Sequence, residues 1–268
     1  MTRLISFSLY GTSDVYLQGA LRNVRLAASV YPQWKVRIYV SEEIDSSLLA
    51  KMESAGAEII RQQRTSVIDG MFWRFYPAAD PQIDAVIIRD ADSRLTLRER
   101  LAVDQWLESD RPLHIMRDHP LHQVPMMGGL WGCRKGFLSQ LPLQVSSWKL
   151  WHKKGQDQDF LRDNVYRQYR HQCFVHSDFY GYPGEQVHPF PGVRDRGEFA
   201  GCVYLPDRDC LTDEQHAAGQ ALLSSSQFRS LPEPKFPRRS TLVANQWLRD
   251  LRNQVSRLVA TGLRKTAA

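Results

Sequence analysis

Apolar residues along the N-terminal part of the chain alternate between a period of two and a period of three to four. Residues 4–9 alternate as a strand does, and apolar residues recur at helical spacing over 17–31, where Pro32 stops the helix. Residues 36–40 and 57–60 predict two further strands, with a helix over 42–55 between them. This β-α-β-α-β order predicts an α/β fold, a mostly parallel sheet with helices on both faces.

The most informative pattern lies in residues 84–94. Val86, Ile87 and Ile88 form a β-branched run of the kind found in strands covered on both faces, and Asp90 and Asp92 follow where this strand should end. Residues two apart on a strand share a face at about 6.5 Å, and a cation relieves the repulsion between two such carboxylates. Hard oxygen ligands favour magnesium, manganese or calcium. A solvated polar turn is the alternative.

An aromatic helical turn over residues 72–77 precedes this strand. Its aromatic side chains are interpreted as buried packing, but Arg74 among them needs an anionic or carbonyl partner, and a phosphate would serve. Beyond the strand, residues 97–107 predict a helix and residues 113–116 another strand.

Three later stretches carry residues whose role the pattern leaves open. Glycines break the periodicity over 127–132 and would let the backbone approach a ligand, and Trp131 offers a face for a sugar ring; a plain tight turn is the alternative. Asp157 opens a helix that runs to about Arg170, and it serves either a ligand or the helix dipole. His176, within 174–178, is either a metal ligand or a structural histidine.

Taken in order, these segments resemble the GT-A class of nucleotide-sugar glycosyltransferases, in particular the glycogenin-type and bacterial lipopolysaccharide galactosyltransferases. In that pattern an Arg-Phe helix and a proline precede a hydrophobic strand ending in Asp-x-Asp, and a glycine-rich turn, an Asp-Gln motif and a histidine follow. The resemblance covers roughly residues 1–205. The matching residues are Arg74, Phe75, Pro77, Asp90, Asp92, Gly128, Gly129, Asp157, Gln158 and His176.

The resemblance implies a role for each matching position. Asp90, Asp92 and His176 would bind Mn²⁺ or Mg²⁺, which would bridge the donor's phosphates as a Lewis acid. Asp157 would be the catalytic residue, close to the reacting carbon of the transferred sugar. The residues that would contact the donor or its sugar are Phe7, Ser8, Leu9, Tyr10, Arg74, Arg94, Gly128, Gly129, Trp131 and Gln158.

The function implied by the resemblance is hexosyl transfer from a nucleotide-sugar, with a UDP-sugar expected, to a glycan or lipid-linked acceptor in bacterial surface polysaccharide assembly. The Asp-Gln motif resembles retaining more than inverting members. Two alternatives stay open: a carbohydrate- or nucleotide-binding partner of another transferase, and a phosphatase of the haloacid-dehalogenase type. The latter carries Asp-x-Asp on its first strand, whereas three predicted strands come earlier here.

Composition is that of an ordinary globular protein, with 268 residues, 43% hydrophobic and 24% charged. The four cysteines, Cys133, Cys173, Cys202 and Cys210, are dispersed, which argues against a zinc site or a disulfide framework and for reduced packing residues. No apolar run is long enough for a transmembrane helix, and the N-terminus lacks a signal-peptide pattern. A cytoplasmic protein is expected.

The basic charge is concentrated at the C-terminus. Residues 235–268 carry eight basic side chains and one acidic, which leaves 27 basic against 28 acidic in the rest, so nucleic acid is not an expected partner. We expect a glycosyltransferase domain over 1–205 and a helical extension over 206–268, with a helix at 211–223 and a linker over 224–237. A basic amphipathic helix over 242–263, with Trp247, is expected on the anionic inner face of the cytoplasmic membrane; packing on the body or a partner subunit is the alternative.

Overall fold

The computed structural model describes residues 1–64, 69–148, 155–194, 197–206 and 212–236. The chain divides into two units, Met1–Pro234 and Lys235–Ala268. The amphipathic helix predicted over 242–263 lies outside the described residues. The division of the chain after residue 205 stays a prediction.

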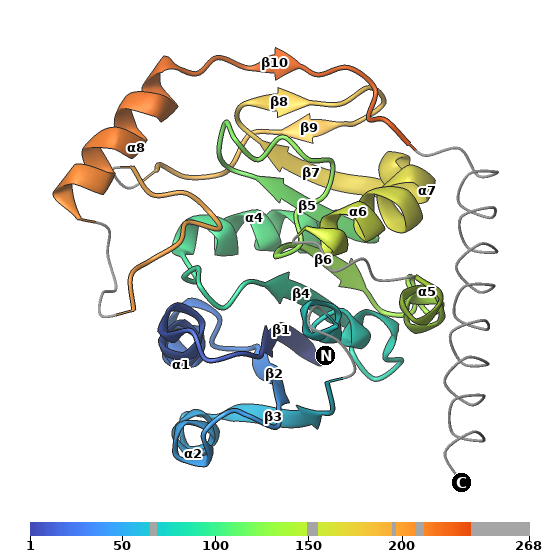
Figure 1. The fold of residues 1–268 in the computed structure, drawn as a ribbon. Coiled ribbons are helices and arrows are strands. Elements are labelled where there is room, and N and C mark those ends of the chain that lie inside the picture. The colour runs from blue at the N-terminus through green and yellow to red at the C-terminus, as the bar shows by residue number, and fades with distance from the viewer. Residues whose placement is uncertain (65–68, 149–154, 195–196, 207–211, 237–268) are drawn as a thin grey trace, which may run out of the picture. The chain divides into compact units, whose positions relative to one another are not determined.

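A mostly parallel sheet forms the centre of the first unit (Figure 1). In the described residues it has eight strands in the order β3-β2-β1-β4-β6-β5-β7-β9, and only β6 runs antiparallel, to both β4 and β5. Its strands are β1 (Arg3–Leu9), β2 (Lys35–Ser41), β3 (Ala57–Gln62), β4 (Ala85–Arg89), β5 (Leu113–Arg117), β6 (Leu130–Arg134), β7 (Cys173–Ser177) and β9 (Val187–His188). The predicted α/β fold is confirmed.

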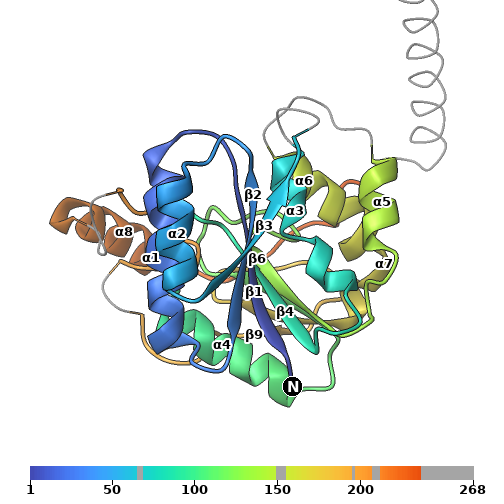
Figure 2. The same cartoon turned by 90° about the horizontal axis from the view of Figure 1, so that it is seen from below.

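Helices cover both faces of this sheet (Figure 2). One face carries α1 (Asp14–Val30), α2 (Ser46–Ser54) and α4 (Leu97–Glu108), and the other carries α3 (Gly70–Trp73), α5 (Leu141–Ser147), α6 (Gln156–Phe160) and α7 (Arg167–Tyr169). A large apolar cluster joins α1, α2 and α4 to β1, β2 and β4 on the first face. This cluster explains why apolar positions of the N-terminal half recur at alternating helical and strand periods.

Two predicted helices have different bounds in the structure. The second helix begins at Ser46 because the Asp45 side chain accepts from the backbone N–H of Ser47 at 2.9 Å and of Leu48 at 3.1 Å, which caps the helix there. The helix predicted from Asp157 to Arg170 is divided into α6, a π-helical turn over Leu161–Tyr166, α7 and a 3₁₀ turn over Arg170–Gln172.

Some stretches without a strand prediction form strands, and two of them change another prediction. Leu130–Arg134, predicted as part of a glycine-rich turn, is β6, because its residues pair with both β4 and β5 in the middle of the sheet. Within the predicted linker, β10 (Arg229–Ser230) pairs in parallel with β8 (Tyr180–Gly181). α8 (Asp213–Ser225) lies where the helix over 211–223 is predicted. α8 and β10 both belong to the first unit.

The parallel strands direct polar residues to one edge of the sheet. Tyr10 follows β1, Asp90 follows β4, Asp118 follows β5 and Asp178 follows β7. The carboxyl ends of parallel strands lie at the same edge of a sheet. These four side chains therefore lie on one side of the unit, although their strands are distant in sequence.

Candidate active site

Arg74 connects two carboxylates from distant parts of the chain. Its guanidinium forms ion pairs with Asp90, after β4, and with Asp157, in α6, where Nη2 and Oδ2 are 2.8 Å apart. Its backbone N–H donates to Ser8 Oγ at 2.9 Å, which ties the end of α3 to β1. Burial alone would lower the pKa of Arg74, but the charges of Asp90 and Asp157 outweigh burial and raise it. The predicted anionic partner of Arg74 is therefore a pair of carboxylates of this chain.

The two carboxylates differ in their exposure to solvent. The Asp90 side chain is 43% exposed, whereas that of Asp157 is 9% exposed. Burial raises the pKa of Asp157, and the neighbouring Arg74 opposes that rise without cancelling it. Asp90 is thus accessible to a ligand, and Asp157 is a mostly buried carboxylate held by a fixed cation.

Gly128 and Gly129 pack directly against this cluster. A β-carbon on Gly128 would collide with the Asp157 carboxylate and lie 2.9 Å from Arg74 Nη2, and one on Gly129 would collide with the Asp90 carboxylate. A larger residue at either position would force these charged groups to shift, because the backbone before β6 passes at contact distance from them. The structure brings these two glycines together with Arg74, Asp90 and Asp157.

Tyr10 and Tyr16 lie beside the aspartates. Burial raises the pKa of the Tyr10 phenol, Arg74 opposes this, and the charges of Asp157 and Asp90 add to the rise. For Tyr16 burial is again the largest cause, followed by the charges of Asp92 and Asp90. Tyr10 is one of the predicted donor-binding residues; Tyr16, in the first turn of α1, has no signal in the sequence that would have singled it out.

Two predicted donor contacts, Phe7 and Leu9, have fully buried side chains. Both belong to the apolar cluster that joins β1 to α1, so only their backbone could meet a ligand. Ser8 points to the opposite face, as alternation along a strand requires, and reaches Arg74.

Trp131 requires a correction. It is fully buried in β6 and packs edge-on against Phe75, with ring centroids 5.2 Å apart. A ring enclosed in the core offers no face to a sugar, so the prediction for Trp131 is wrong on physical grounds. The run Leu130–Arg134 is part of the sheet rather than a ligand-lining turn, and the approach to the site ends at Gly129.

His176 lies away from Asp90 and Asp92. Its strand β7 is three strand spacings from β4, roughly 14 Å at about 4.8 Å each. Its Nδ1 is 2.8 Å from His114 Nε2, and its Nε2 is 2.9 Å from Oε1 of Gln105 in α4, on the face of the sheet opposite to Arg74 and Asp157. Burial is the main cause that lowers its pKa, to about 3. The structure gives His176 the surroundings of a structural histidine.

Arg94 and Gln158 take different positions relative to the cluster. Arg94 is buried, donates to the Ser93 carbonyl at 3.0 Å and lies over the Tyr204 ring, so it supports the turn after Asp92. Gln158 follows Asp157 in α6, and its backbone N–H donates to Asp157 Oδ1 at 3.0 Å. Its side chain is partly exposed beside the carboxylate.

The donor set at this edge fits a hard divalent cation. Asp90 and Asp92 are both partly exposed, and magnesium-type ions are held by one or two carboxylates together with phosphate oxygens and water. In the part of the chain that the structure describes, no three His, Cys, Asp or Glu side chains are grouped to hold a metal.

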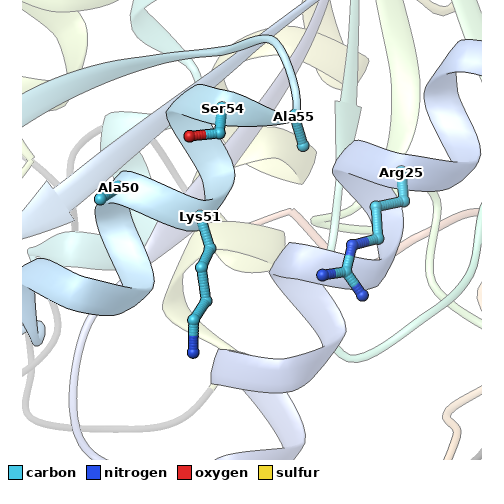
Figure 3. A pocket seen from close by; sticks show the side chains of 5 residues that line it. All are labelled: Arg25, Ala50, Lys51, Ser54 and Ala55. Carbon is cyan, nitrogen blue, oxygen red and sulfur yellow. The ribbon is translucent and has the colours of Figure 1, made fainter.

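A shallow surface hollow of about 400 Å³ lies elsewhere, between α1 and α2 (Figure 3). Arg25, Ala50, Lys51, Ser54 and Ala55 line it. These residues are in the later turns of both helices, toward the amino ends of the strands, so the hollow is at the opposite edge from Asp90. No carboxylate lines it, and the chemistry favours the Asp90 edge as the site.

Comparison with known proteins gives fold likenesses only. No protein-family model and no curated protein match the sequence. Among solved structures, a mannosyltransferase from Pyrobaculum calidifontis, in complex with GDP-Man and Mn²⁺, is 14% identical over 52% of this chain at a TM-score of 0.40. This chain spans less than half of that protein, 46%.

Two further structures are matched over more of their length. The glucosyl-3-phosphoglycerate synthase from Mycobacterium tuberculosis, with uridine diphosphate, is 14% identical, with 84% of this chain and 79% of that one covered and a TM-score of 0.42. The 4-diphosphocytidyl-2C-methyl-D-erythritol synthase from Anaerococcus prevotii is 10% identical, with 83% and 96% covered and a TM-score of 0.44. None of the helices in the described residues is long and apolar enough to cross a membrane.

Proposed function

We propose that this chain is a metal-dependent glycosyltransferase that transfers a hexose from a nucleotide-sugar, with a UDP-sugar the expected donor. One observation carries the proposal: Arg74, Asp90 and Asp157 meet at the carboxyl edge of a parallel sheet, against the paired glycines Gly128 and Gly129. Their sequence order matches the glycosyltransferase pattern, and their convergence in space is independent of that order.

Asp90 and Asp92 would hold Mn²⁺ or Mg²⁺ together with the donor's phosphate oxygens. When bound, this ion would neutralise the charge of the departing nucleoside diphosphate. Arg74 brings a fixed positive charge to the same place, and its planar guanidinium suits a phosphate oxygen as well as a carboxylate. The glycine backbone at Gly128 and Gly129 leaves room for a sugar beside these groups.

Asp157 would be the catalytic carboxylate. It is mostly buried and held by Arg74 at 2.8 Å, so its orientation is fixed before a sugar arrives. An anionic group in such a place stabilises the positive charge that develops on the sugar in a glycosyl-transfer transition state. We propose retention of anomeric configuration, in accordance with the Asp157-Gln158 order in the sequence.

The test is a screen of nucleotide-sugars for Mn²⁺-dependent release of the nucleoside diphosphate by the full-length chain. Asp90→Asn and Asp92→Asn, which remove charge but little volume, should reduce release to background while the unfolding transition is kept. Asp104→Asn is the matched control, because Asp104 pairs with Arg100 within α4 and is remote from the site. Undiminished release in EDTA, or in both variants, would contradict the metal assignment. A nucleotide-binding partner without turnover would bind donors and release nothing.

We further propose a lipid-linked or glycan acceptor in bacterial surface polysaccharide assembly, with the chain held peripherally at the inner face of the cytoplasmic membrane. The support is the charge of residues 235–268, eight basic side chains against one acidic, together with the apolar spacing around Trp247. Each basic side chain near an anionic surface contributes about 1 kcal/mol, so several suffice for reversible attachment.

A chain cut after Pro234 tests this attachment. It should no longer sediment with anionic liposomes that bind the full-length protein at low salt, and it should keep donor hydrolysis. Neutral liposomes are the control, and high salt should weaken the binding without abolishing it, since apolar contacts are not screened. A full-length protein that ignores anionic liposomes at low salt would point to a soluble acceptor.

A further inference from the structure

Asn23 is a polar residue inside the apolar stripe of α1. It lies at helical spacing from Ala20 and Ala27, both buried, and is itself fully buried. A buried amide in such a stripe requires partners for its donors and its acceptor. A polar side chain at a core position of a predicted helix indicates a buried hydrogen-bonding role. An analysis of apolar periodicity alone does not detect it.

Asn23 forms hydrogen bonds to the turn that carries the aspartates. Its Nδ2 donates to the carbonyl of Ser93 at 2.8 Å and of Ala91 at 3.3 Å, and its Oδ1 accepts from the N–H of Leu95 at 3.0 Å. One side chain thus holds the backbone on both sides of Asp92. Only an amide of this length supplies two donors and an acceptor at the same place.

The same turn is fixed at its other carbonyl groups. The Asp90 carbonyl accepts from Ser93 Oγ at 2.9 Å, and the Asp92 carbonyl accepts from the N–H of Tyr204 at 3.1 Å. Together with the bonds from Asn23, every carbonyl from Asp90 to Ser93 therefore has a hydrogen-bond donor. These hydrogen bonds fix the backbone of the turn. The bonds from Asn23 are the ones that a side chain of α1 contributes.

Gly19 allows α1 to come this close. It precedes Asn23 by one helical turn, and a β-carbon there would collide with the Ala91 carbonyl oxygen and lie 3.2 Å from Arg94 Nη1. A larger residue would push α1 away from the turn and lengthen the bonds of Asn23. Gly19 and Asn23 therefore act together on the same backbone.

We infer that Asn23 is a positioning residue, which sets the separation and direction of the Asp90 and Asp92 carboxylates for a divalent cation. The inference rests on the proposed function. Asp90 and Asp92 flank Ala91, so a shift in the Ala91 or Ser93 peptide alters the relative direction of the two side chains. Groups that orient ligands from behind typically change metal affinity by about 10- to 100-fold when they are removed.

The experiment compares Mn²⁺ binding to wild-type, Asn23→Ala and Val24→Ala proteins, measured from the electron paramagnetic resonance signal of free Mn²⁺. Val24→Ala removes a buried side chain from the next position of the same helix but no hydrogen bond to the turn. We expect Asn23→Ala to weaken Mn²⁺ binding by about 10- to 100-fold and Val24→Ala to leave it unchanged. Equal affinity in folded Asn23→Ala, or an equal loss in Val24→Ala, would overturn the inference.

Amide hydrogen exchange over residues 91–95 gives a second readout that needs no metal. It should be faster in Asn23→Ala and unchanged in Val24→Ala, because only Asn23 accepts from the Leu95 N–H. If Asn23→Ala does not fold, Asn23→Ser, which keeps a shorter donor and acceptor, replaces it in both measurements. If wild-type protein binds no Mn²⁺, the metal-dependent function fails, and exchange alone decides: unchanged rates in the Asn23 variant would overturn its hold on the turn.

Discussion

Two clusters of arginine and aspartate lie at the carboxyl edge of the same sheet, and they are built for different purposes. Around β1 and β4, Arg74 pairs with Asp90 and Asp157. Around β5 and β7, Asp118 and Asp178 pair with Arg98 and Arg194. In both, an aspartate directly follows a buried strand.

The difference lies in what remains for a ligand. Asp118 is fully buried: it accepts hydrogen bonds from Arg98 Nε at 2.8 Å, Arg98 Nη2 at 3.0 Å and the Ala200 N–H at 2.9 Å, and it forms an ion pair with Arg194 Nη2 at 2.7 Å. These partners occupy both oxygens of the carboxylate. Asp90 is 43% exposed and is paired with Arg74. The first carboxylate anchors the loop around residues 194 and 200, and the second is open to a ligand.

The largest expected effect separates the clusters by stability. Asp118→Ala removes the fully buried carboxylate from two mostly buried guanidinium groups, which keep the partly exposed Asp178, and should cost about 3–5 kcal/mol of unfolding free energy. Asp90→Ala, at a half-exposed position where Arg74 keeps Asp157, should cost no more than about 1 kcal/mol. Urea unfolding of the two variants measures both values. Equal losses would show that the Asp90 cluster is also a structural anchor.

The sequence predicts the elements better than it separates these clusters. Local periodicity predicts the strands β1 to β5 and the helices α1 and α4, because each of these elements buries apolar residues that recur at its own strand or helix period. β6 could not be found in this way: its interior glycine and short run resemble a turn, and its pairing depends on β4 and β5, which are distant in sequence.

The candidate site divides along the same line. The order of motifs in the chain singles out Asp90, Arg74 and Asp157, which the structure brings together and whose roles stay predictions. The burial of Trp131 and the distance of His176 from Asp90 depend on strand order in the sheet, which local sequence does not give. The hold of Asn23 on the aspartate turn is also a tertiary contact. Local sequence predicts which residues lie at strand ends. It predicts less well which of these residues are in contact in the folded chain.

A smaller expected effect concerns Asp157, in the cluster around Arg74. A substitution there should change the turnover number and not the stability of the fold. Asp157→Asn should lower kcat by about 100-fold and change the donor KM little, because a group near the reacting carbon acts mainly in the transition state. Burial raises the pKa of Asp157, so wild-type kcat should fall, as pH decreases, at a higher pH than an ordinary aspartate would give. Steady-state kinetics against pH measures both. A raised KM with unchanged kcat would make Asp157 a binding residue.

The smallest expected effect is an acid sensitivity confined to the β5 and β7 side. Burial is the main cause that lowers the pKa of His122 and of His176 to about 3. Neighbouring positive charges add to this effect, among them Arg194 for His122 and Arg98 for His176. Their unfolded value is about 6.5, so protonation favours the unfolded chain as pH falls below that value, by at most about 1.4 kcal/mol per pH unit for each histidine. Stability should thus be lost between about pH 6.5 and about pH 3 and be unaffected by these groups above that window. His122→Gln and His176→Gln should each flatten the dependence of unfolding free energy on pH, whatever they cost at pH 7. Unfolding measured in urea at pH 7 and pH 5 gives the slope, and an unchanged slope in both variants would mean that neither histidine is held neutral in the folded protein.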